Sequence, residues 1–395
     1  MQKISGENMT GSSIKVAMYF PYYLPAKGGA ESATYNLTRE LRSNTSCDAR
    51  IWAFAKENKL SKNGLSENSL NDDSMKDVPI IKYYPTRLPL LNNFSMRLLF
   101  DLGKSDEQLI HFQGAPRAFN RLLIEKMVKG KITFLTTHGL QESVSLVKCS
   151  KARFFLNPFF LESLRSINHI IALSRADANF LLSMGIQSDK ISVIPNGLDE
   201  SKFKNRRSFV NKNNKLKILT VARFDANKNY EVLVPLVAKL SKKFDLEAYF
   251  VGALSNQAYF NKILRLIKQY KVESLVKIGL SLDDSALADC YMSCDLFILP
   301  SRVETFGISI LEAMYCGLPV IASNVGGIPD ILMPNTNSLI SNPDNIEELY
   351  CLAFKLLNDK EMRRTAGSRN KELSRNYTWR KVAIRTSNLY KSFVE

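Results

Sequence analysis

Short apolar runs rich in β-branched residues alternate with helical patterns along the whole chain, and this alternation places the fold in the α/β class. Strands that follow one another through helices pair in parallel, and helices then cover both faces of the sheet. The expected strands are residues 14–20, 50–54, 80–84, 108–112, 131–136, 169–173 and 192–194 in the first half, and 217–222, 247–251, 276–278, 295–299 and 320–322 in the second. The pattern therefore predicts parallel sheets packed between helices.

The length of the chain predicts two such sheets. Its 395 residues exceed the roughly 250 to 300 residues at which a single core stops growing. Segment 201–214 is rich in Lys, Arg and Asn and poor in apolar residues, so we expect the linker there. Segment 56–77 is polar and without aromatic residues, which is typical of a surface loop. Two doubly wound, Rossmann-like domains that face each other leave a central cleft at the carboxyl ends of their strands, where such sheets bind ligands.

Composition narrows the class of partner. The 54 Lys and Arg residues outnumber the 38 Asp and Glu residues, and the net charge of +16 favours nucleic acid, an anionic membrane face or a diphosphate-bearing substrate. The six cysteines include no Cys-x-x-Cys pair, which indicates reduced thiols in the cytosol. Each of the three histidines falls on a different expected element, so we expect no metal centre. We find no signal peptide and no membrane-length apolar run, and we expect a cytoplasmic protein attached at most to a surface.

Two carboxylates, Glu304 and Glu312, lie in an otherwise apolar strand, turn, helix and strand over residues 299–330. The helix is expected over residues 306–316 and is apolar over most of its surface, so it is buried. An ionised carboxylate in such a place costs several kcal/mol unless hydrogen-bond donors surround it, and a sugar diol supplies such donors. Alternatively, Glu312 pairs with a structural Arg or Lys.

Two cations follow the expected strand 217–222. Arg223 and Lys228 lie five residues apart on a strand-to-helix loop, where a guanidinium fork and an ammonium can clamp a diphosphate. The alternative is that both are solvated charges. His138 also ends an expected strand, a position where a histidine is more often structural.

Gly28 and Gly29 precede an amphipathic helix, so their backbone N–H groups can approach an anion, although a plain tight turn is equally compatible. Glu31, at the mouth of this loop, is a candidate to touch an acceptor hydroxyl or merely favours the start of the helix.

Taken in order, these motifs resemble the retaining nucleotide-sugar glycosyltransferases of family four. The matching elements are Gly28-Gly29, Pro195-Asn196-Gly197-x-Asp199, Arg223 with Lys228, Glu304 with Glu312, Ala313-x-x-x-Gly317-x-Pro319 and Gly326-Gly327. The resemblance implies the GT-B fold, with an acceptor-binding domain over residues 1–200, a donor-binding domain over 201–375, and a final helix within 376–395 that crosses back to the first domain. Three positions depart from the family pattern, namely Asn229 for the usual glycine, Asp330 for glutamate and Ser338 for glycine.

The resemblance also implies roles for individual residues. Glu312 would bind the ribose hydroxyls of the nucleotide and Glu304 the hydroxyls of the donor sugar. Arg223 and Lys228 would hold the diphosphate and stabilise its charge as it leaves, and His138 would lie near the primary hydroxyl of the sugar. The implied catalytic group is Arg223, Lys228, Glu304 and His138, and the donor-binding group is Gly28, Gly29, Arg223, Lys228, Glu304, Phe306, Gly307 and Glu312.

The implied activity is metal-independent transfer of a hexosyl unit from a nucleoside diphosphate sugar to an acceptor hydroxyl, with retention at the anomeric carbon and without a cofactor. We expect an acceptor in a surface polysaccharide such as lipopolysaccharide, or in a lipid-linked glycan. The alternatives are a nucleotide-sugar epimerase of the same architecture and, from other classes, a catalytically silent binding subunit or a basic polyanion-binding protein. No recognisable nucleic-acid motif is present, so nucleic acid is not expected as a partner.

The basic excess also suits a membrane surface. Residues 117–153 carry eight Lys and Arg against two Glu, and the amphipathic stretch around Arg121, Lys126 and Lys129 would dock on anionic lipids at the inner face of the plasma membrane. An ordinary solvated helix explains the same pattern. Aromatic-rich segments 83–100 and 154–160 would shape the acceptor site or pack in the core.

Overall fold

The computed structural model describes residues 13–23, 28–54, 77–83, 95–114, 125, 128–140, 161–204, 215–332, 338–340 and 342–395. Several expectations fall wholly or largely outside these ranges, namely the polar loop 56–77, the aromatic segments 83–100 and 154–160, and the basic stretch at Arg121 and Lys126. The chain divides into two compact units. Unit 1 comprises Met1–Gly197 with Trp379–Glu395, and unit 2 is Leu198–Thr378.

Unit 1 is built on a seven-stranded parallel sheet of order β3-β2-β1-β4-β5-β6-β7. Its strands are β1 Ile14–Tyr23, β2 Cys47–Phe54, β3 Ile80–Tyr83, β4 Leu109–Gln113, β5 Ile132–Thr136, β6 His169–Ala172 and β7 Ile191–Val193. The strand order reverses between β1 and β4, and ligands of doubly wound sheets bind beside such a reversal. The predicted parallel sheet of the first half is confirmed.

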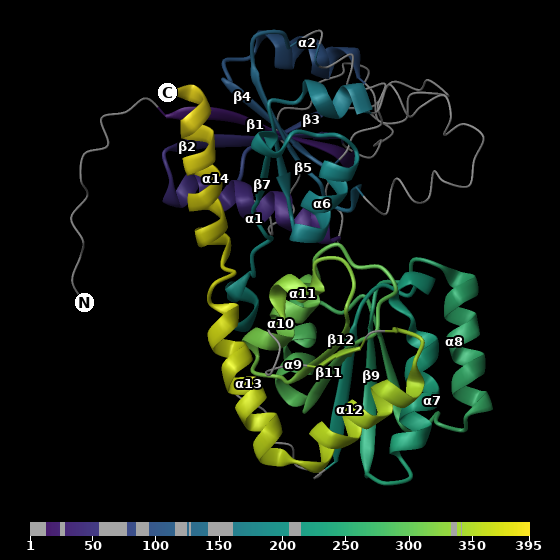
Figure 1. Cartoon of the computed structure of the whole chain (residues 1–395). Helices are drawn as coiled ribbons and strands as arrows, with labels where there is room; N and C mark the ends of the chain where they lie inside the picture. Colours follow the sequence, from purple (N-terminus) through teal and green to yellow (C-terminus); the bar gives the residue numbers. More distant parts are fainter. Residues whose placement is uncertain are drawn as a thin grey trace. The chain divides into compact units, whose positions relative to one another are not determined.

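Alternate residues of β1 pack into two separate hydrophobic cores of unit 1, one on each face of the sheet. Val16, Met18 and Phe20 pack against helices α1 and α14. Ala17 and Tyr19 face the opposite core, beneath α2 and α6. This period of two explains why β1 reads as a continuous apolar run, because both faces of the sheet are buried. The helices named here are α1 Gly29–Asn44, α2 Met96–Lys104, α6 Arg175–Ser183 and α14 Trp379–Val394 (Figure 1).

Unit 2 carries a six-stranded parallel sheet of order β10-β9-β8-β11-β12-β13. Its strands are β8 Leu216–Val221, β9 Leu246–Gly252, β10 Val276–Leu280, β11 Leu296–Leu299, β12 Val320–Ser323 and β13 Ser338–Ile340. The α-helices are α7 Tyr230–Leu240, α8 Gln257–Gln269, α9 Asp284–Ser293, α10 Ile308–Tyr315, α11 Ile328–Ile331, α12 Ile346–Asn358 and α13 Lys360–Ser374. Short 3-10 helices are η2 Ser188–Lys190 in unit 1, and η3 Glu200–Phe203 and η4 Ala226–Lys228 in unit 2.

Three details differ from the sequence-based expectations. Strand β13 was not expected, because its only two apolar residues, Leu339 and Ile340, lie within a polar stretch. Helix α10 begins at Ile308 rather than at residue 306, because Gly307 has a left-handed φ of 96° that cannot belong to the helix. The chain passes from unit 1 to unit 2 at Gly197–Leu198, and the first residues of the expected linker instead form η3.

Within the described part of the chain, every cysteine side chain is a free thiol. No helix there is long and apolar enough to cross a membrane.

Candidate functional site

Loops at one edge of the unit 2 sheet carry half of the predicted site residues. Strands β8, β11 and β12 lie side by side and run parallel, so their carboxyl ends meet at the same edge. The loop after β8 carries Arg223 and Lys228, and the loop after β11 carries Glu304. The loop after β12 carries Gly326 and Gly327. Residues about 100 positions apart in the sequence are therefore neighbours in space.

Lys228 and Glu304 form an ion pair at this edge. The Nζ of Lys228 lies 2.9 Å from Oε2 of Glu304 and donates a second hydrogen bond of 3.2 Å to the carbonyl of Val303. The side chains are only 9% and 16% exposed. The predicted diphosphate-binding cation and the predicted sugar-binding carboxylate thus hold each other in place. The alternative of two solvated cations is wrong for Lys228.

Arg223 is more open than Lys228. Its side chain is 59% exposed, and its guanidinium lies 3.7 Å from the carboxylate of Asp225. An exposed pair at this distance stabilises by only about 0 to 1 kcal/mol, so little energy holds the guanidinium there. Arg223 is therefore available to an anion that reaches the end of β8.

Asn229 shows why glycine is the usual residue after the lysine. Its backbone adopts the left-handed conformation, with φ 56° and ψ 44°. Asparagine is among the few side chains that enter this region readily. Its amide nitrogen also donates to the carbonyl of Pro343 at 2.8 Å and to the carboxylate of Asp344 at 3.1 Å. The departure at Asn229 therefore preserves the backbone turn and adds two hydrogen bonds.

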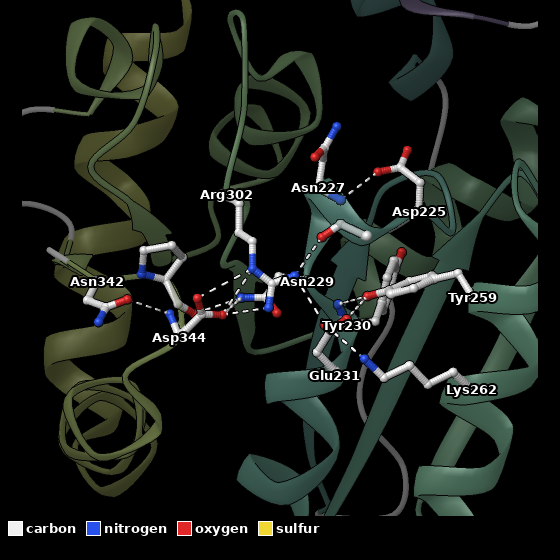
Figure 2. A network of polar contacts seen from close by, with 12 residues as sticks. Asp225, Asn227, Asn229, Tyr230, Glu231, Tyr259, Lys262, Arg302, Asn342 and Asp344 are labelled. Atoms are coloured by element: carbon white, nitrogen blue, oxygen red, sulfur yellow. Dashed lines mark hydrogen bonds and ion pairs between the residues drawn. The ribbon is translucent and has the colours of Figure 1, made fainter. Parts of the chain in front are cut away.

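Arg302 joins the loops that carry the predicted cations and carboxylates (Figure 2). Its guanidinium pairs with Asp344 through Nη2 at 2.6 Å and Nε at 3.1 Å. Nη1 donates to Glu231 at 3.1 Å and to the carbonyl of Ala226 at 2.8 Å. The backbone N–H of Arg302 donates to the carbonyl of Asn227 at 2.7 Å. Arg302 thus ties the β8 loop to the β11 loop.

Our sequence reasoning missed Arg302. The available signal was a planar five-donor side chain two residues before Glu304, directly after an expected strand.

Glu231 is the partner of Arg302 at the start of α7. It also accepts from the Tyr259 hydroxyl and from the Lys262 ammonium, and Figure 2 shows these side chains around it. Burial alone would raise the pKa of Glu231, but hydrogen bonds from Tyr259 and the charge of Arg302 outweigh it and lower that pKa. Glu231 therefore stays ionised and keeps its hold on Arg302 at neutral pH.

Glu312 is buried on α10 with both carboxylate oxygens engaged. Lys202 donates to Oε1 at 3.1 Å, and the Tyr291 hydroxyl donates to Oε2 at 2.9 Å. The Glu312 side chain is 7% exposed. Glu312 thus pairs with a lysine, Lys202, as the alternative interpretation expected. An ionised carboxylate offers about four acceptor positions, so two of them are left for further donors.

Gly326 and Gly327 allow the β12 loop to approach the backbone of Glu304. A Cβ placed on Gly326 would lie 1.7 Å from the Glu304 carbonyl oxygen, and the φ of Gly326 is +54°. The N–H of Gly327 lies 3.4 Å from the same oxygen and donates to it. This glycine pair therefore fixes the position of Glu304.

Phe306 and Gly307 form the turn between Glu304 and α10. The Phe306 side chain is buried, and its ring centroid lies 6.3 Å from that of Tyr377. Gly307 is the residue before the helix, with the left-handed φ noted above.

Unit 1 holds the remaining predicted residues. Gly28 is the N-cap of α1, with an extended φ of −142°, and Gly29 begins the helix. Glu31 lies in the first turn, where a carboxylate stabilises the positive end of the helix dipole. Its carboxylate folds back over Gly28, because an added Cβ there would lie 2.2 Å from Oε2 of Glu31. This geometry matches the structural alternative for Glu31.

His138 follows β5 at the carboxyl edge of the unit 1 sheet, with a positive φ of 36°. Its Nε2 lies 2.9 Å from Oε1 of Gln113 at the end of β4. Burial lowers the pKa of His138 to about 4, so the imidazole is neutral at pH 7. The acceptor on Gln113 requires Nε2 to carry the proton, which leaves Nδ1 as an acceptor.

His138 lines a small cavity in unit 1 with Gln113, Thr136 and residues of α1 and α14. The neighbouring His111 is fully buried and bonds Tyr390 of α14 and Thr136 instead. His111 therefore anchors α14 to the sheet.

Unit 2 combines an exposed arginine, a buried ammonium, a half-buried carboxylate on Glu304 and a buried carboxylate on Glu312. Cations next to a strand edge bind phosphate oxygens, and carboxylates accept hydrogen bonds from sugar hydroxyls. Among the residues that the structure describes, no three His, Cys, Asp or Glu side chains lie close enough to hold a metal ion.

The two units, each a parallel α/β sheet, have the architecture of the GT-B glycosyltransferases. A family model described as Glycosyltransferase Family 4 matches residues 27–202, and one described as Glycosyl transferases group 1 matches residues 201–373. The chain therefore belongs to the group 1, family 4 glycosyltransferases of the GT-B fold.

Proteins with similar sequences match different lengths of this chain. The phosphatidylinositol N-acetylglucosaminyltransferase GPI3 subunit of Saccharomyces cerevisiae is 23% identical over 95% of this chain and 82% of its own length. An MMP α-(1→4)-mannosyltransferase of Mycolicibacterium hassiacum is 26% identical over 58% of this chain and 55% of its own length.

Solved structures share the fold over almost the whole chain. Anabaena HepE, in complex with UDP and glucose, matches with a TM-score of 0.76 and 18% identity, covering 96% of this chain and 100% of that one. Sucrose-phosphate synthase from Thermosynechococcus elongatus matches with a TM-score of 0.75 and 20% identity, covering 96% and 99%. At identities this low, the matches show a shared fold.

Proposed function

We propose that this glycosyltransferase moves a hexosyl unit from a nucleoside diphosphate sugar to an acceptor hydroxyl, with retention at the anomeric carbon and without a metal ion. The observation that carries the proposal is the Lys228–Glu304 pair beside the exposed Arg223. Cations and a carboxylate at one strand edge suit the two ends of one ligand, a diphosphate and a polyol. The UDP and glucose in the HepE structure support a donor of the same class.

In the proposed reaction, the bond between the anomeric carbon and the diphosphate oxygen breaks while the acceptor oxygen bonds to the same face of that carbon. The departing diphosphate takes the proton of the acceptor hydroxyl. Arg223 and Lys228 neutralise the charge that develops on the leaving group, and preorganised cations of this kind supply a large part of such rate accelerations.

Glu304 acts in this proposal as a binding residue for the sugar and not as a nucleophile. Its Oε2 is occupied by Lys228 at 2.9 Å, which holds the carboxylate toward the cation. A retaining glycosidase would instead aim two free carboxylates at the scissile bond from about 5 Å apart. The Nδ1 atom of the neutral His138 can accept a hydrogen bond from a sugar hydroxyl.

The two cations also support metal independence. A divalent ion would neutralise the leaving diphosphate in other transferases, and here Arg223 and Lys228 would supply positive charge to it. Activity that survives treatment with EDTA is expected, and activity that returns only with added Mg²⁺ or Mn²⁺ would contradict this part.

The proposed acceptor is a hydroxyl of a surface polysaccharide or of a lipid-linked glycan. The net charge of +16 supports docking at an anionic membrane face, where such acceptors lie. Reversing the charges of Arg121, Lys126 and Lys129 should abolish sedimentation with vesicles that contain phosphatidylglycerol, and unchanged sedimentation would defeat this docking surface.

A panel of UDP-, GDP- and ADP-sugars tests the transferase. We expect one donor to raise the melting temperature and to undergo slow hydrolysis. Epimerised donor in the absence of acceptor would favour the epimerase, and no effect from any donor would favour a silent binding protein.

A further inference from the structure

Lys202 lies in the short helix η3, four residues after the chain enters unit 2, and its ammonium reaches Glu312. The Lys202 side chain is 19% exposed, and its Nζ is also 3.9 Å from the carboxylate of Asp284. Burial alone would lower the pKa of Lys202, but the charges of Glu312 and Asp284 outweigh it and raise that pKa. Lys202 is therefore a charged donor that is directed at Glu312.

Phe203 fixes the helix that carries Lys202. Its side chain is buried, and its ring centroid lies 5.3 Å from that of Tyr315 and 6.1 Å from that of Tyr291. Tyr315 is the last residue of α10, the same helix that carries Glu312. Lys202 and Glu312 are thus held together by aromatic packing as well as by charge.

Tyr291 holds the other oxygen of the carboxylate. It is fully buried, and burial raises the pKa of its hydroxyl well above the usual value, so the hydroxyl remains a donor. With Lys202 on Oε1 and Tyr291 on Oε2, the plane of the Glu312 carboxylate is fixed. Each oxygen keeps one lone pair for another donor, a pattern that matches two adjacent hydroxyls of a ribose.

We propose that Lys202 is a positioning residue of the nucleotide site: it orients the Glu312 carboxylate so that this group accepts hydrogen bonds from both ribose hydroxyls. This inference rests on the proposed function, since that function assigns the ribose to Glu312. Lys202 thereby sets the preference of the enzyme for nucleotides that carry both hydroxyls.

A merely structural ion pair would behave differently. Its loss would destabilise unit 2 and weaken the binding of every nucleotide to the same extent. Loss of a positioning residue weakens the binding only of nucleotides that carry the ribose hydroxyls. The comparison of a ribonucleotide with its 2′,3′-dideoxy counterpart therefore separates the two roles.

The experiment measures binding of UDP, GDP and ADP, and of their 2′,3′-dideoxy forms, by isothermal titration calorimetry. For the base that binds best, we expect wild-type enzyme to prefer the ribonucleotide by roughly tenfold or more, as for two hydrogen bonds to a charged group. Lys202→Met should bring the ribonucleotide to the affinity of the dideoxy form and leave the dideoxy affinity unchanged. Lys202→Arg should restore the preference.

The matched control is Lys190→Met, which removes a lysine from the short helix η2 of unit 1. Lys190 donates to the carbonyl of Arg165 at 2.9 Å, away from Glu312 in the sequence and in another unit. This variant should keep the full preference. Glu312→Gln should reduce the preference for the ribonucleotide as much as Lys202→Met does. The double variant should reduce this preference no further than either single variant, because both changes remove the same hydrogen bonds to the ribose.

Each outcome is decisive for one of the two claims. A Lys202→Met enzyme that keeps the preference, or that loses both affinities equally, overturns the positioning role. If Lys202→Met does not fold, Tyr291→Phe tests the same carboxylate from its other oxygen, and an unchanged preference there also overturns it. Wild-type enzyme that binds no nucleoside diphosphate refutes the proposed function itself.

Discussion

Replacing Gly326 with alanine should disable the enzyme without unfolding it. The new Cβ would lie 1.7 Å from the Glu304 carbonyl oxygen, where real contacts of this kind are not shorter than 3.0 Å. The backbone at Glu304 or at Gly326 must therefore move by at least 1.3 Å, the difference between these two distances. Both neighbours are backbone, so no side chain can turn away to relieve the contact.

The expected loss is about 100-fold in kcat/KM, because a shift of roughly 1 Å at a substrate-positioning group costs that much. The left-handed φ of Gly326 adds about 1 to 2 kcal/mol of strain for a side chain. The assay compares donor hydrolysis with the melting temperature of each variant.

Gly317→Ala is the matched control for this prediction. Gly317 also has a positive φ, +78°, but its added Cβ would meet only the Gly367 carbonyl at an ordinary 3.7 Å. The Gly317→Ala variant should have a lower melting temperature, as Gly326→Ala does, but should keep most of its activity. Gly326→Ala enzyme with more than half of the wild-type kcat/KM would refute the idea that the glycine pair positions Glu304.

Three further outcomes follow from the described contacts. Arg223→Ala should lower kcat in donor hydrolysis about 100- to 1000-fold, as for other lost transition-state donors. Its melting temperature should stay unchanged because the side chain is exposed, and unaltered turnover would show that Arg223 does not bind the diphosphate. Arg302→Lys should cost about 1 kcal/mol in urea unfolding, since an ammonium cannot make the paired bonds to Asp344. The variant should also lower kcat/KM, and equal stability would count against the tie between loops. Burial lowers the pKa of His111 to about 3, so the unfolded chain binds its proton at higher pH. From pH 7 to pH 5 this histidine alone should lower the free energy of unfolding by about 2 kcal/mol, in addition to the fall caused by the lowered pKa of His138; a slope that His111→Asn leaves unchanged would contradict this.

The alternation of apolar runs was sufficient to predict both parallel sheets, because a strand that is buried on both faces must be apolar throughout. Strand β13 was missed because its two apolar residues, Leu339 and Ile340, lie within a polar stretch and form no apolar run. The start of α10 depended on the backbone conformation of Gly307, which sequence composition does not reveal.

The site was predicted in part, since strand-end positions follow from the parallel sheet. The pairings were not predictable. Lys228 lies 76 residues from Glu304, and Lys202 lies 110 residues from Glu312, so each contact depends on how separate loops pack. Arg302 was missed for the same reason, because its partners come from three different segments. The predicted roles of the site residues stay predictions.

The proposed retaining transfer is tested most directly by proton NMR of the anomeric signal, recorded while the enzyme turns over the donor selected from the panel. We expect the first sugar product to have the anomeric configuration of the donor, and we expect Arg223→Ala and Glu304→Gln nearly to abolish its formation. An inverted anomer, an epimerised donor, or equal product formation by both variants would contradict this.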